Sequence, residues 1–405
     1  MKILNVGSHH RVKGGSDRYS LALESLLRRK GHRVIPFAAS SPEDDAGEEA
    51  ARFPPGVDAD NPSPADVARF VFNPEARSSV ADLLEKHRPD IAHLHAYSGQ
   101  LSASILKPIR QRGVPIVQTL HDYKLGCPVR IFVSRGDLCE ACEGEHFWRA
   151  LPRRCNRGAL ARTALNVVEA YVSRWLGDAS APHHFVAPSR FLRNKMRDHD
   201  IVAPDRITTV PNFVYPGDFR PARGAGEHLV YVGRLREMKG VRTLVHASAS
   251  LPEVPLLIVG TGPDREALER GVDQEGLSHV RFVGFKDGEE LHDLIRRSIA
   301  VVVPSELYEN CPMVVLEAMA LGRPVIGSEI GGIPELVTHG EDGLLFDAGD
   351  TEGLRARLEW AVAHRTEAQR MGEAGRRKIE EKFGPDTHYD RLMEIYRAVV
   401  PGWTQ

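Results

Sequence analysis

The chain has 405 residues, of which 42% are hydrophobic and 27% charged, and its formal net charge is −2 at pH 7. This length exceeds one ordinary hydrophobic core, so we expect two domains. The composition excludes a disordered or fibrous protein, and the sequence contains no apolar run long enough for a transmembrane helix. The first predicted strand begins at residue 2, which predicts a cytoplasmic protein without a signal peptide.

Charge is distributed unevenly between the two halves of the chain. Residues 1–220 hold 31 Lys+Arg against 25 Asp+Glu, whereas residues 221–405 hold 22 against 30. A basic first half is typical of proteins that meet an anionic partner or an anionic membrane surface. Chance variation in surface charge explains the asymmetry equally well. We expect no nucleic-acid partner.

The first half alternates apolar strands with helical patterns. Residues 16–31 form a predicted helix with Ser16 as its N-cap and Gly31 as its stop. Residues 40–75 are rich in Pro, Asp and Glu without periodicity, which predicts a long loop. The predicted strands of this half are 2–7, 32–38, 90–96, 114–120, 183–189 and 207–213.

After a predicted linker at 215–227, the second half repeats the alternation. Its predicted strands are 228–233, 255–260, 279–285, 300–305, 324–328 and 343–347. Strands that alternate with helices predict two doubly wound parallel sheets, that is, two Rossmann-like α/β domains facing each other across a cleft. We place the domains at 1–214 and 215–385, followed by a C-terminal helical segment at 386–405.

Six polar or glycine-rich stretches directly follow predicted strands. Because α/β sheets bind ligands outside the carboxyl ends of their strands, these stretches are the candidate functional loops. They are KGGSDR (13–18), His121 with Asp122, GRLREMKG (233–240), GTGP (260–263), SELYENCP (305–312) and GGIPE (331–335).

The loops of the second half have the chemistry of a diphosphate site. Glycine-rich turns that lead into helices present backbone N–H groups and the positive end of the helix dipole. Arg234 and Lys239 flank one such turn and can balance the charge of a diphosphate. Pro312 opens a predicted apolar helix over 313–321, which would point at the same volume. Cations and dipoles would then stabilise the leaving group without a metal.

Two glutamates surround this predicted helix start. Glu309 lies in the turn after a strand, and Glu317 lies about one and a half turns into the helix. A carboxylate accepts two hydrogen bonds and a vicinal diol donates two, so each glutamate could hold one diol of a nucleotide-sugar. A structural role for Glu317, paired with an arginine at the edge of a buried helix, is the alternative.

The chain resembles the family 4 retaining glycosyltransferases, which have the GT-B fold. In the second half the resemblance lies in GRLREMKG, VGTGP, residues 305–337 and the GLLFD strand. In the first half it lies in KGGSDR, PDIAHLH (89–95) and TLHDY (119–123). The resemblance implies transfer of a sugar from a nucleotide-diphosphate-sugar donor to a saccharide or lipid-linked saccharide, in the synthesis of cell-surface polysaccharide or glycoconjugates.

The resemblance also implies residue roles. Glu309 would hold the hydroxyls of the donor sugar, Glu317 the ribose, and Arg234 and Lys239 the diphosphate, while His121 would contact the sugar near the reacting carbon. His121, Glu309, Arg234 and Lys239 are therefore the predicted catalytic group. The other predicted donor-binding residues are Gly14, Gly15, Gly233, Gly262, Phe285, Asn310, Cys311 and Pro312.

The sequence departs from the family pattern at one place. Family members often have glycine and phenylalanine where this chain has Asn310 and Cys311. The motifs contain no evident enzymic nucleophile, so we expect a front-face displacement in which the leaving diphosphate assists the acceptor. The C-terminal helix at 386–399 is expected to cross back to the first domain.

Other functions remain to be distinguished. An NAD-dependent dehydrogenase would need a complete G-x-G-x-x-G, and the turn at 260–263 lacks the third glycine. An epimerase or phosphorylase with the same two-lobed fold, or a non-catalytic nucleotide-sugar-binding protein, would retain many of the same residues. The basic run 149–162 favours an acceptor reached at the inner face of the membrane, and an ordinary solvated helix is the alternative.

Four of the five cysteines fall within residues 127–155. A cytosolic chain has little use for disulfides, and clustered cysteines there indicate metal binding or catalysis. We predict a structural zinc site formed by Cys127, Cys139, Cys142 and Cys155, with no part in the chemistry. The alternatives are four reduced thiols packed as small hydrophobic groups, or a disulfide formed when the protein is oxidised on handling.

Overall fold

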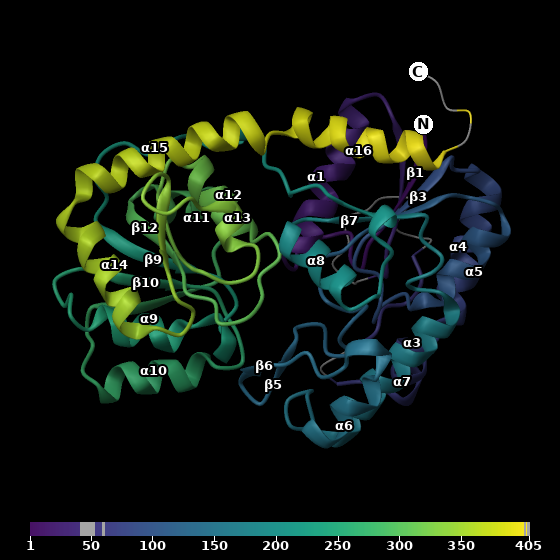
Figure 1. The fold of residues 1–405 in the computed structure, drawn as a ribbon, viewed down its shortest axis with the longest axis horizontal. Helices are drawn as coiled ribbons and strands as arrows, with labels where there is room; N and C mark the ends of the chain where they lie inside the picture. The colour runs from purple at the N-terminus through teal and green to yellow at the C-terminus, as the bar shows by residue number, and fades with distance from the viewer. Residues whose placement is uncertain (41–52, 59–60, 401, 403–405) are drawn as a thin grey trace. The chain divides into compact units, whose positions relative to one another are not determined.

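The chain divides into two structural units in the computed structural model, which describes residues 1–40, 53–58, 61–400 and 402 (Figure 1). Unit 1 comprises residues 1–211 and 388–405, and unit 2 comprises residues 212–387. Each unit is built on its own six-stranded parallel sheet, so the predicted class of two doubly wound α/β domains is confirmed.

The unit 1 sheet has the strand order β2-β1-β3-β4-β7-β8, with every neighbouring pair parallel. Its strands are β1 (Lys2–Val6), β2 (Arg33–Phe37), β3 (Ile91–Leu94), β4 (Ile116–Thr119), β7 (His184–Ala187) and β8 (Ile207–Thr209). The helices of unit 1 are α1 (Gly15–Arg29), α3 (Pro64–Val71), α4 (Pro74–His87), α5 (Leu106–Gln111), α6 (Ala150–Arg153), α7 (Leu160–Leu176), α8 (Arg190–Asp198) and the C-terminal α16 (Pro385–Val399), which begins in unit 2.

The unit 2 sheet has the strand order β11-β10-β9-β12-β13-β14, again parallel throughout. Its strands are β9 (His228–Val232), β10 (Leu256–Val259), β11 (Val280–Gly284), β12 (Ser298–Val303), β13 (Val325–Ser328) and β14 (Gly343–Phe346). Its helices are α9 (Val241–Ser248), α10 (Arg265–Gln274), α11 (Gly288–Arg296), α12 (Met313–Ala320), α13 (Ile333–Leu336), α14 (Thr351–Ala363) and α15 (Arg365–Lys382).

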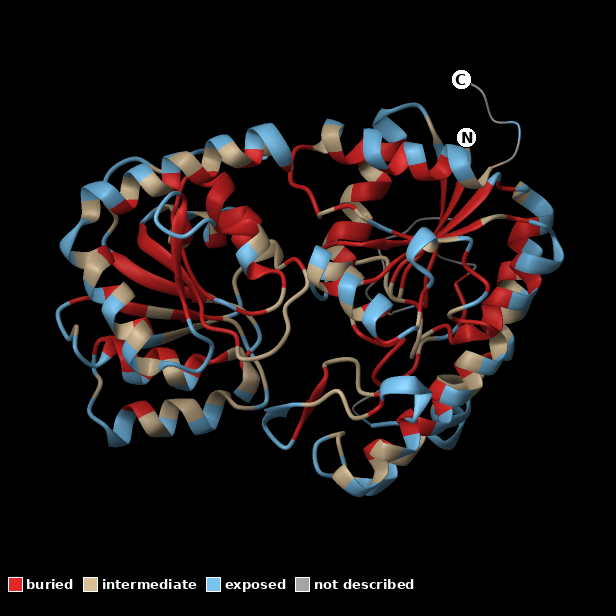
Figure 2. Cartoon of the chain, in the orientation of Figure 1, coloured by how far each residue is buried: buried red, intermediate tan, exposed pale blue. Residues whose placement is uncertain are grey.

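Both faces of the unit 2 sheet are covered, which explains why its strands are continuous apolar runs rather than alternating ones (Figure 2). One apolar cluster joins Val230 and Val301 to α11, α12 and α15. A second cluster joins the neighbouring residues Leu229 and Val302 to α9 and α14 on the other face. Successive residues of a strand therefore pack into the apolar clusters on opposite faces of the sheet.

The C-terminal helix α16 supplies buried polar contacts to unit 1. The Tyr19 hydroxyl and His388 Nε2 lie 3.0 Å apart, and the Tyr396 hydroxyl lies 2.5 Å from His93 Nδ1. Both tyrosines are almost completely buried. These contacts place residues from the end of the chain in the interior of unit 1.

Two local predictions in the first half need correction. The first helix begins at Gly15 with Gly14 as N-cap, not at Ser16. The predicted loop at 40–75 includes α3 and the start of α4, and its residues 41–52 and 59–60 lie outside the described part of the chain. Ser63 and Asp66 form a capping box that starts α3, so the sequence S-P-A-D carried a helix signal that the absence of periodicity obscured.

Segment 127–155 contains a short antiparallel pair, β5 (Val133–Ser134) and β6 (Asp137–Leu138), followed by short helical turns. It also shares a small apolar cluster with α7, in which Cys142, Phe147 and Ala150 pack against Val167 and Ala170. The segment is therefore held partly by apolar packing against a long helix.

Candidate functional site

The strand order of unit 2 identifies the edge where a ligand would bind. β9 and β12 are neighbours at the centre of the sheet. After β9 the chain continues to β10 on one side, and after β12 it continues to β13 on the other side. In open α/β sheets this switch point opens a crevice at the carboxyl ends of the two strands. The loop 233–240 follows β9 and the loop 304–312 follows β12. Two of the predicted functional loops therefore flank the switch point.

These two loops are joined by an ion pair. Lys239 Nζ donates to Glu309 Oε1 at 2.5 Å, and the Ser305 hydroxyl donates to the same oxygen at 2.6 Å. The side chains of Lys239 and Glu309 are 26% and 13% exposed, so both remain accessible to solvent. The structure thus brings together two of the four predicted catalytic residues.

Ser305 was not among the predicted site residues. It is buried, and its backbone oxygen accepts a hydrogen bond from the Ser328 hydroxyl at 2.6 Å, which ties the end of β12 to β13. The sequence signal for Ser305 was its position four residues before Glu309 in the candidate loop SELYENCP (305–312). Ser305, itself buried, therefore helps to hold the Glu309 carboxylate in place.

Two glycines make the close packing of these loops feasible. Gly331 has φ +60°, and a Cβ there would lie 2.3 Å from the backbone oxygen of Glu309 and 2.6 Å from its nitrogen. Gly332 N donates to the same Glu309 oxygen at 2.7 Å. Gly240 has φ +70°, and a Cβ there would lie 1.8 Å from the oxygen of Pro304. Only glycine allows the loops after β9 and β13 to approach the loop after β12 so closely.

Helix α12 starts directly after this loop. Pro312 is its N-cap and Met313 its first residue, so the helix begins where it was predicted and ends one residue earlier, at Ala320. Cys311 is buried among apolar side chains, and burial raises the pKa of its thiol to about 12. A neutral, buried thiol is not a nucleophile, which agrees with a role for Cys311 through its backbone alone. Glu317 is 4% exposed on the inner part of α12.

The remaining predicted donor residues of unit 2 lie in neighbouring loops. Arg234 is exposed, and its backbone oxygen accepts from the Tyr231 hydroxyl at 3.0 Å. Gly262 packs against Leu235, so the loops after β9 and β10 also lie side by side. Phe285, at the end of β11, is 64% exposed. A large exposed aromatic side chain at this edge of the sheet is suited to contact a base or a sugar.

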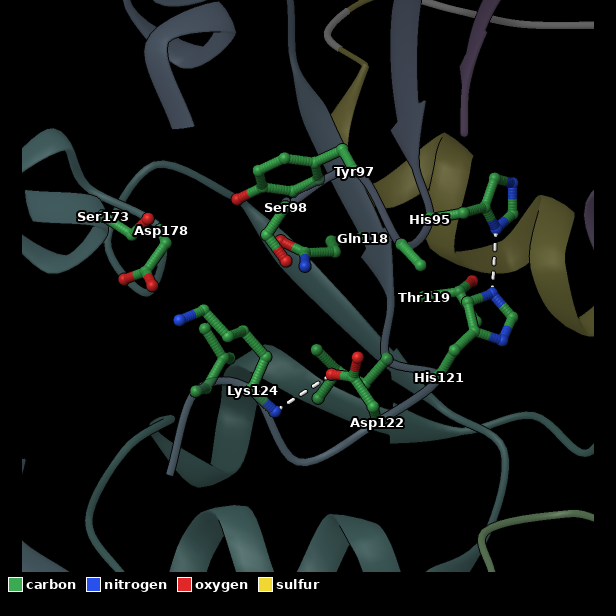
Figure 3. A pocket seen from close by; sticks show the side chains of 13 residues that line it. His95, Tyr97, Ser98, Gln118, Thr119, His121, Asp122, Lys124, Ser173 and Asp178 are labelled. Carbon is green, nitrogen blue, oxygen red and sulfur yellow. Dashed lines mark hydrogen bonds between the residues drawn. The ribbon is translucent and has the colours of Figure 1, made fainter. Parts of the chain in front are cut away.

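In unit 1, His121 follows β4 and lies in a chain of buried polar groups (Figure 3). His95 Nε2 lies 2.9 Å from Asn5 Oδ1, and His95 Nδ1 lies 3.1 Å from His121 Nε2. Because the amide oxygen only accepts, His95 Nε2 carries a proton and its Nδ1 accepts from His121 Nε2–H. The proton of neutral His121 is thereby held on Nε2, and its Nδ1 is an acceptor atom.

Burial keeps this histidine chain neutral. It lowers the pKa of His121 to about 4, and it lowers the pKa of His95 well below its usual range. His121 can therefore accept a hydrogen bond through Nδ1 near pH 7 but carries no positive charge. Sequence analysis did not single out His95 and Asn5, although His95 ends the PDIAHLH motif.

The small cavity beside His121 is lined by polar side chains that include Asp122, Lys124 and Asp178. Its volume of about 20 Å³ holds little more than one water molecule. Lys124, which is part of the lining, donates through Nζ to the buried Glu169. This cavity alone does not enclose a sugar.

The predicted glycines of unit 1 differ from those of unit 2. Gly14 has φ −168°, an extended conformation open to any residue, and a Cβ there would meet nothing within 4 Å. Gly15 is exposed in the first turn of α1. Neither the backbone conformation nor the packing therefore requires glycine at position 14. The absence of atoms around a Cβ at Gly14 means that the space over the start of α1 is open.

The four cysteines of segment 127–155 are reduced. Burial and, after it, the neighbouring Cys127, Cys155 and Cys139 raise the pKa of Cys142 to about 12. Within the described ranges, no group of three or more His, Cys, Asp or Glu side chains is arranged to hold a metal ion. Zinc binding by these cysteines stays a prediction.

Two doubly wound units, each with glycine-rich loops at the carboxyl edge of its sheet, define the GT-B class of glycosyltransferase folds. Residues 13–217 match the model of Glycosyltransferase Family 4, and residues 220–378 match that of Glycosyl transferases group 1. The chain belongs to Glycosyltransferase Family 4, as its motifs predicted.

Relatives and solved structures agree with this assignment. The chain is 32% identical over 259 residues to alpha-maltose-1-phosphate synthase of Mycolicibacterium smegmatis, a match that covers 56% of this chain and 67% of that protein. It spans about half the length of the glycogen synthase of Mycobacterium tuberculosis, with 35% identity over 191 residues and 46% of each chain covered.

Two solved structures show the same fold along nearly the whole chain. Sucrose-phosphate synthase of Thermosynechococcus elongatus has a TM-score of 0.75 at 21% identity, with 98% of both chains covered. Anabaena HepE, solved in complex with UDP and glucose, has a TM-score of 0.71 at 18% identity, with 98% of this chain and 100% of that chain covered.

Proposed function

We propose that this protein is a retaining, metal-independent glycosyltransferase that moves a sugar from a nucleotide-diphosphate-sugar to a saccharide or lipid-linked saccharide. The observation that carries the proposal is the Lys239–Glu309 pair at the switch point of the unit 2 sheet, 2.5 Å between Nζ and Oε1. In a nucleotide-diphosphate-sugar the anionic diphosphate is bonded directly to the sugar. A cation fixed beside a carboxylate that can accept hydrogen bonds from sugar hydroxyls suits that arrangement. HepE was solved with UDP and glucose, which supports a donor of this chemical class.

The roles of the residues follow from their charges and positions. Lys239 and the exposed Arg234 would balance the charge that develops on the leaving diphosphate. The first turn of α12 adds backbone N–H groups and the positive end of a helix dipole. These groups supply the stabilisation that a divalent metal provides in other transferases, which is the physical basis for proposing metal independence.

Glu309 would accept hydrogen bonds from the donor sugar through the carboxylate oxygen that Lys239 does not occupy. Its bonds to Lys239 and Ser305 hold the carboxylate before the donor arrives, so little ordering entropy is lost on binding. Glu317 is proposed to hold the ribose hydroxyls, and neutral His121 to accept a hydrogen bond through Nδ1 near the reacting carbon. Retention would follow from attack of the acceptor on the face from which the diphosphate departs.

The test compares Glu309→Gln and Lys239→Ala with the wild type, using a panel of nucleotide-sugars and analysis of the product by NMR. Each variant should lower turnover by about a hundredfold or more, the scale for loss of one transition-state electrostatic contact. Arg355→Ala removes an exposed ion pair with Glu352 on α14 and should leave turnover unchanged. The product should keep the anomeric configuration of the donor, and EDTA should not abolish turnover. Near-normal turnover of Glu309→Gln would refute its assigned role.

A further inference from the structure

One face of α7 exposes a continuous apolar stripe. Leu160, Val168, Tyr171 and Trp175 are 52%, 51%, 41% and 83% exposed. At about 100° per residue these four positions fall within about 80° of the helix circumference. We call this set, together with Trp148 at 53% exposure in the preceding turn Phe147–Arg149, the α7 face.

The α7 face is not the side by which the helix packs onto unit 1. The other side of the helix is formed by its buried residues, which are Thr163, Asn166, Val167, Glu169, Ala170 and Ser173. α7 therefore buries a side of mixed polar and apolar residues inside the fold and leaves its apolar stripe exposed. Val67 of the neighbouring α3 is also 38% exposed.

A basic segment leads into this face. Residues 149–168 contain five arginines and no aspartate or glutamate. Arg154, Arg157 and Arg162 are exposed, whereas the guanidinium of Arg149 lies 5.8 Å from the Trp148 ring centre. Two exposed acids, Glu143 and Glu145, precede Trp148, and Arg174 forms an ion pair with Glu145.

We propose that the α7 face docks on a lipid bilayer that contains anionic headgroups. Tryptophan and tyrosine favour the boundary between headgroups and acyl chains, and arginines beside an apolar helix face add electrostatic attraction to anionic lipid. A second copy packed α7 face to α7 face would cover the apolar stripe but would bring the two acid-free runs of arginines together, which is unfavourable. Across the part of the chain that the structure describes, no helix is long and apolar enough to cross a membrane. The docking is therefore interfacial.

This inference extends the proposed function, because a bilayer-bound transferase would meet a lipid-linked acceptor in the same plane. The docking itself needs neither donor nor acceptor. Its failure can therefore be distinguished from a failure of the proposed chemistry.

The test is co-sedimentation of the full chain with vesicles of phosphatidylcholine alone and of phosphatidylcholine with about one third phosphatidylglycerol. We expect binding to the anionic vesicles that weakens at high salt. Trp175→Ser should weaken partitioning on the order of tenfold, from the loss of one buried aromatic side chain. Arg157→Ser and Arg162→Ser should each weaken it about fivefold on anionic vesicles only.

Phe285→Ser is the matched control for vesicle binding, because it removes a comparably exposed aromatic side chain from unit 2. It should bind vesicles as the wild type does. The melting temperatures of the Trp175, Arg157 and Arg162 variants should equal that of the wild type. The increase in melting temperature on addition of UDP should also be the same.

Two results would overturn the proposal. One is vesicle binding that is absent, or that Trp175→Ser and the arginine variants leave unchanged. The other is a dimer in light scattering that Trp175→Ser dissociates, which would assign the α7 face to a second copy of the chain.

Discussion

Substitution of Gly331 by alanine tests whether the packing of the loop after β13 positions Glu309. The new Cβ would lie 2.3 Å from the Glu309 backbone oxygen, so one of the two loops must move by about 1 Å to restore ordinary contact. A displacement of that size at a reacting group costs about a hundredfold in rate. The left-handed backbone at φ +60° adds a stability cost of about 1–2 kcal/mol for a residue with a side chain.

Gly340→Ala provides the control. Gly340 also has positive φ, +80°, but a Cβ there would meet nothing within 4 Å. This variant should lose about 1 kcal/mol of unfolding free energy and keep its turnover. The two proteins are compared by denaturant unfolding and by initial rates with a nucleotide-sugar donor. If Gly331→Ala keeps the turnover of Gly340→Ala, the inference that the Gly331 contact positions Glu309 is wrong.

The remaining predictions concern unit 1. Burial lowers the pKa of His388 to about 4 from an ordinary value of 6.5, so the unfolded chain binds the proton more tightly. The contribution of His388 to stability should therefore be complete above pH 6.5 and fall by up to about 3 kcal/mol toward pH 4, in addition to the falls from buried His95 and His121. A flat profile of unfolding free energy over this range would contradict the burial of these histidines. Glu169→Ala should lower the unfolding free energy by about 3–5 kcal/mol, because it leaves the buried Lys124 charge without its partner; a loss below 1 kcal/mol would show that this pair is solvated. Elemental analysis of reduced, untagged protein should give about one zinc per chain, lost in Cys139→Ser and Cys142→Ser, whereas metal-free, active protein with four titratable thiols would end the zinc prediction.

The strands were predictable because strands of a parallel sheet covered on both faces are continuous apolar runs, and all twelve appear near their predicted positions. Their order was not predictable, because no local pattern records which strands pair. The position of Glu309 after β12 was predictable from its motif. Its contact with Gly331 was not, because it depends on the left-handed backbone of Gly331 and on the close approach of the loops after β12 and β13. Helix α3 was missed because its capping box lies in a segment without apolar periodicity.

The contribution of α16 to unit 1 has a consequence for how the chain is made. Tyr396 is synthesised 303 residues after its hydrogen-bond partner His93. At about 5–20 residues per second, the ribosome needs about 15–60 s to cover that distance. During this interval the whole of unit 2, a single continuous segment, has emerged and can fold, while unit 1 still lacks the helix that covers Tyr19 and His93. The order of folding in the cell is therefore expected to run from the second unit to the first, and a nascent chain stalled before residue 388 should expose unit 1 to chaperones and proteases.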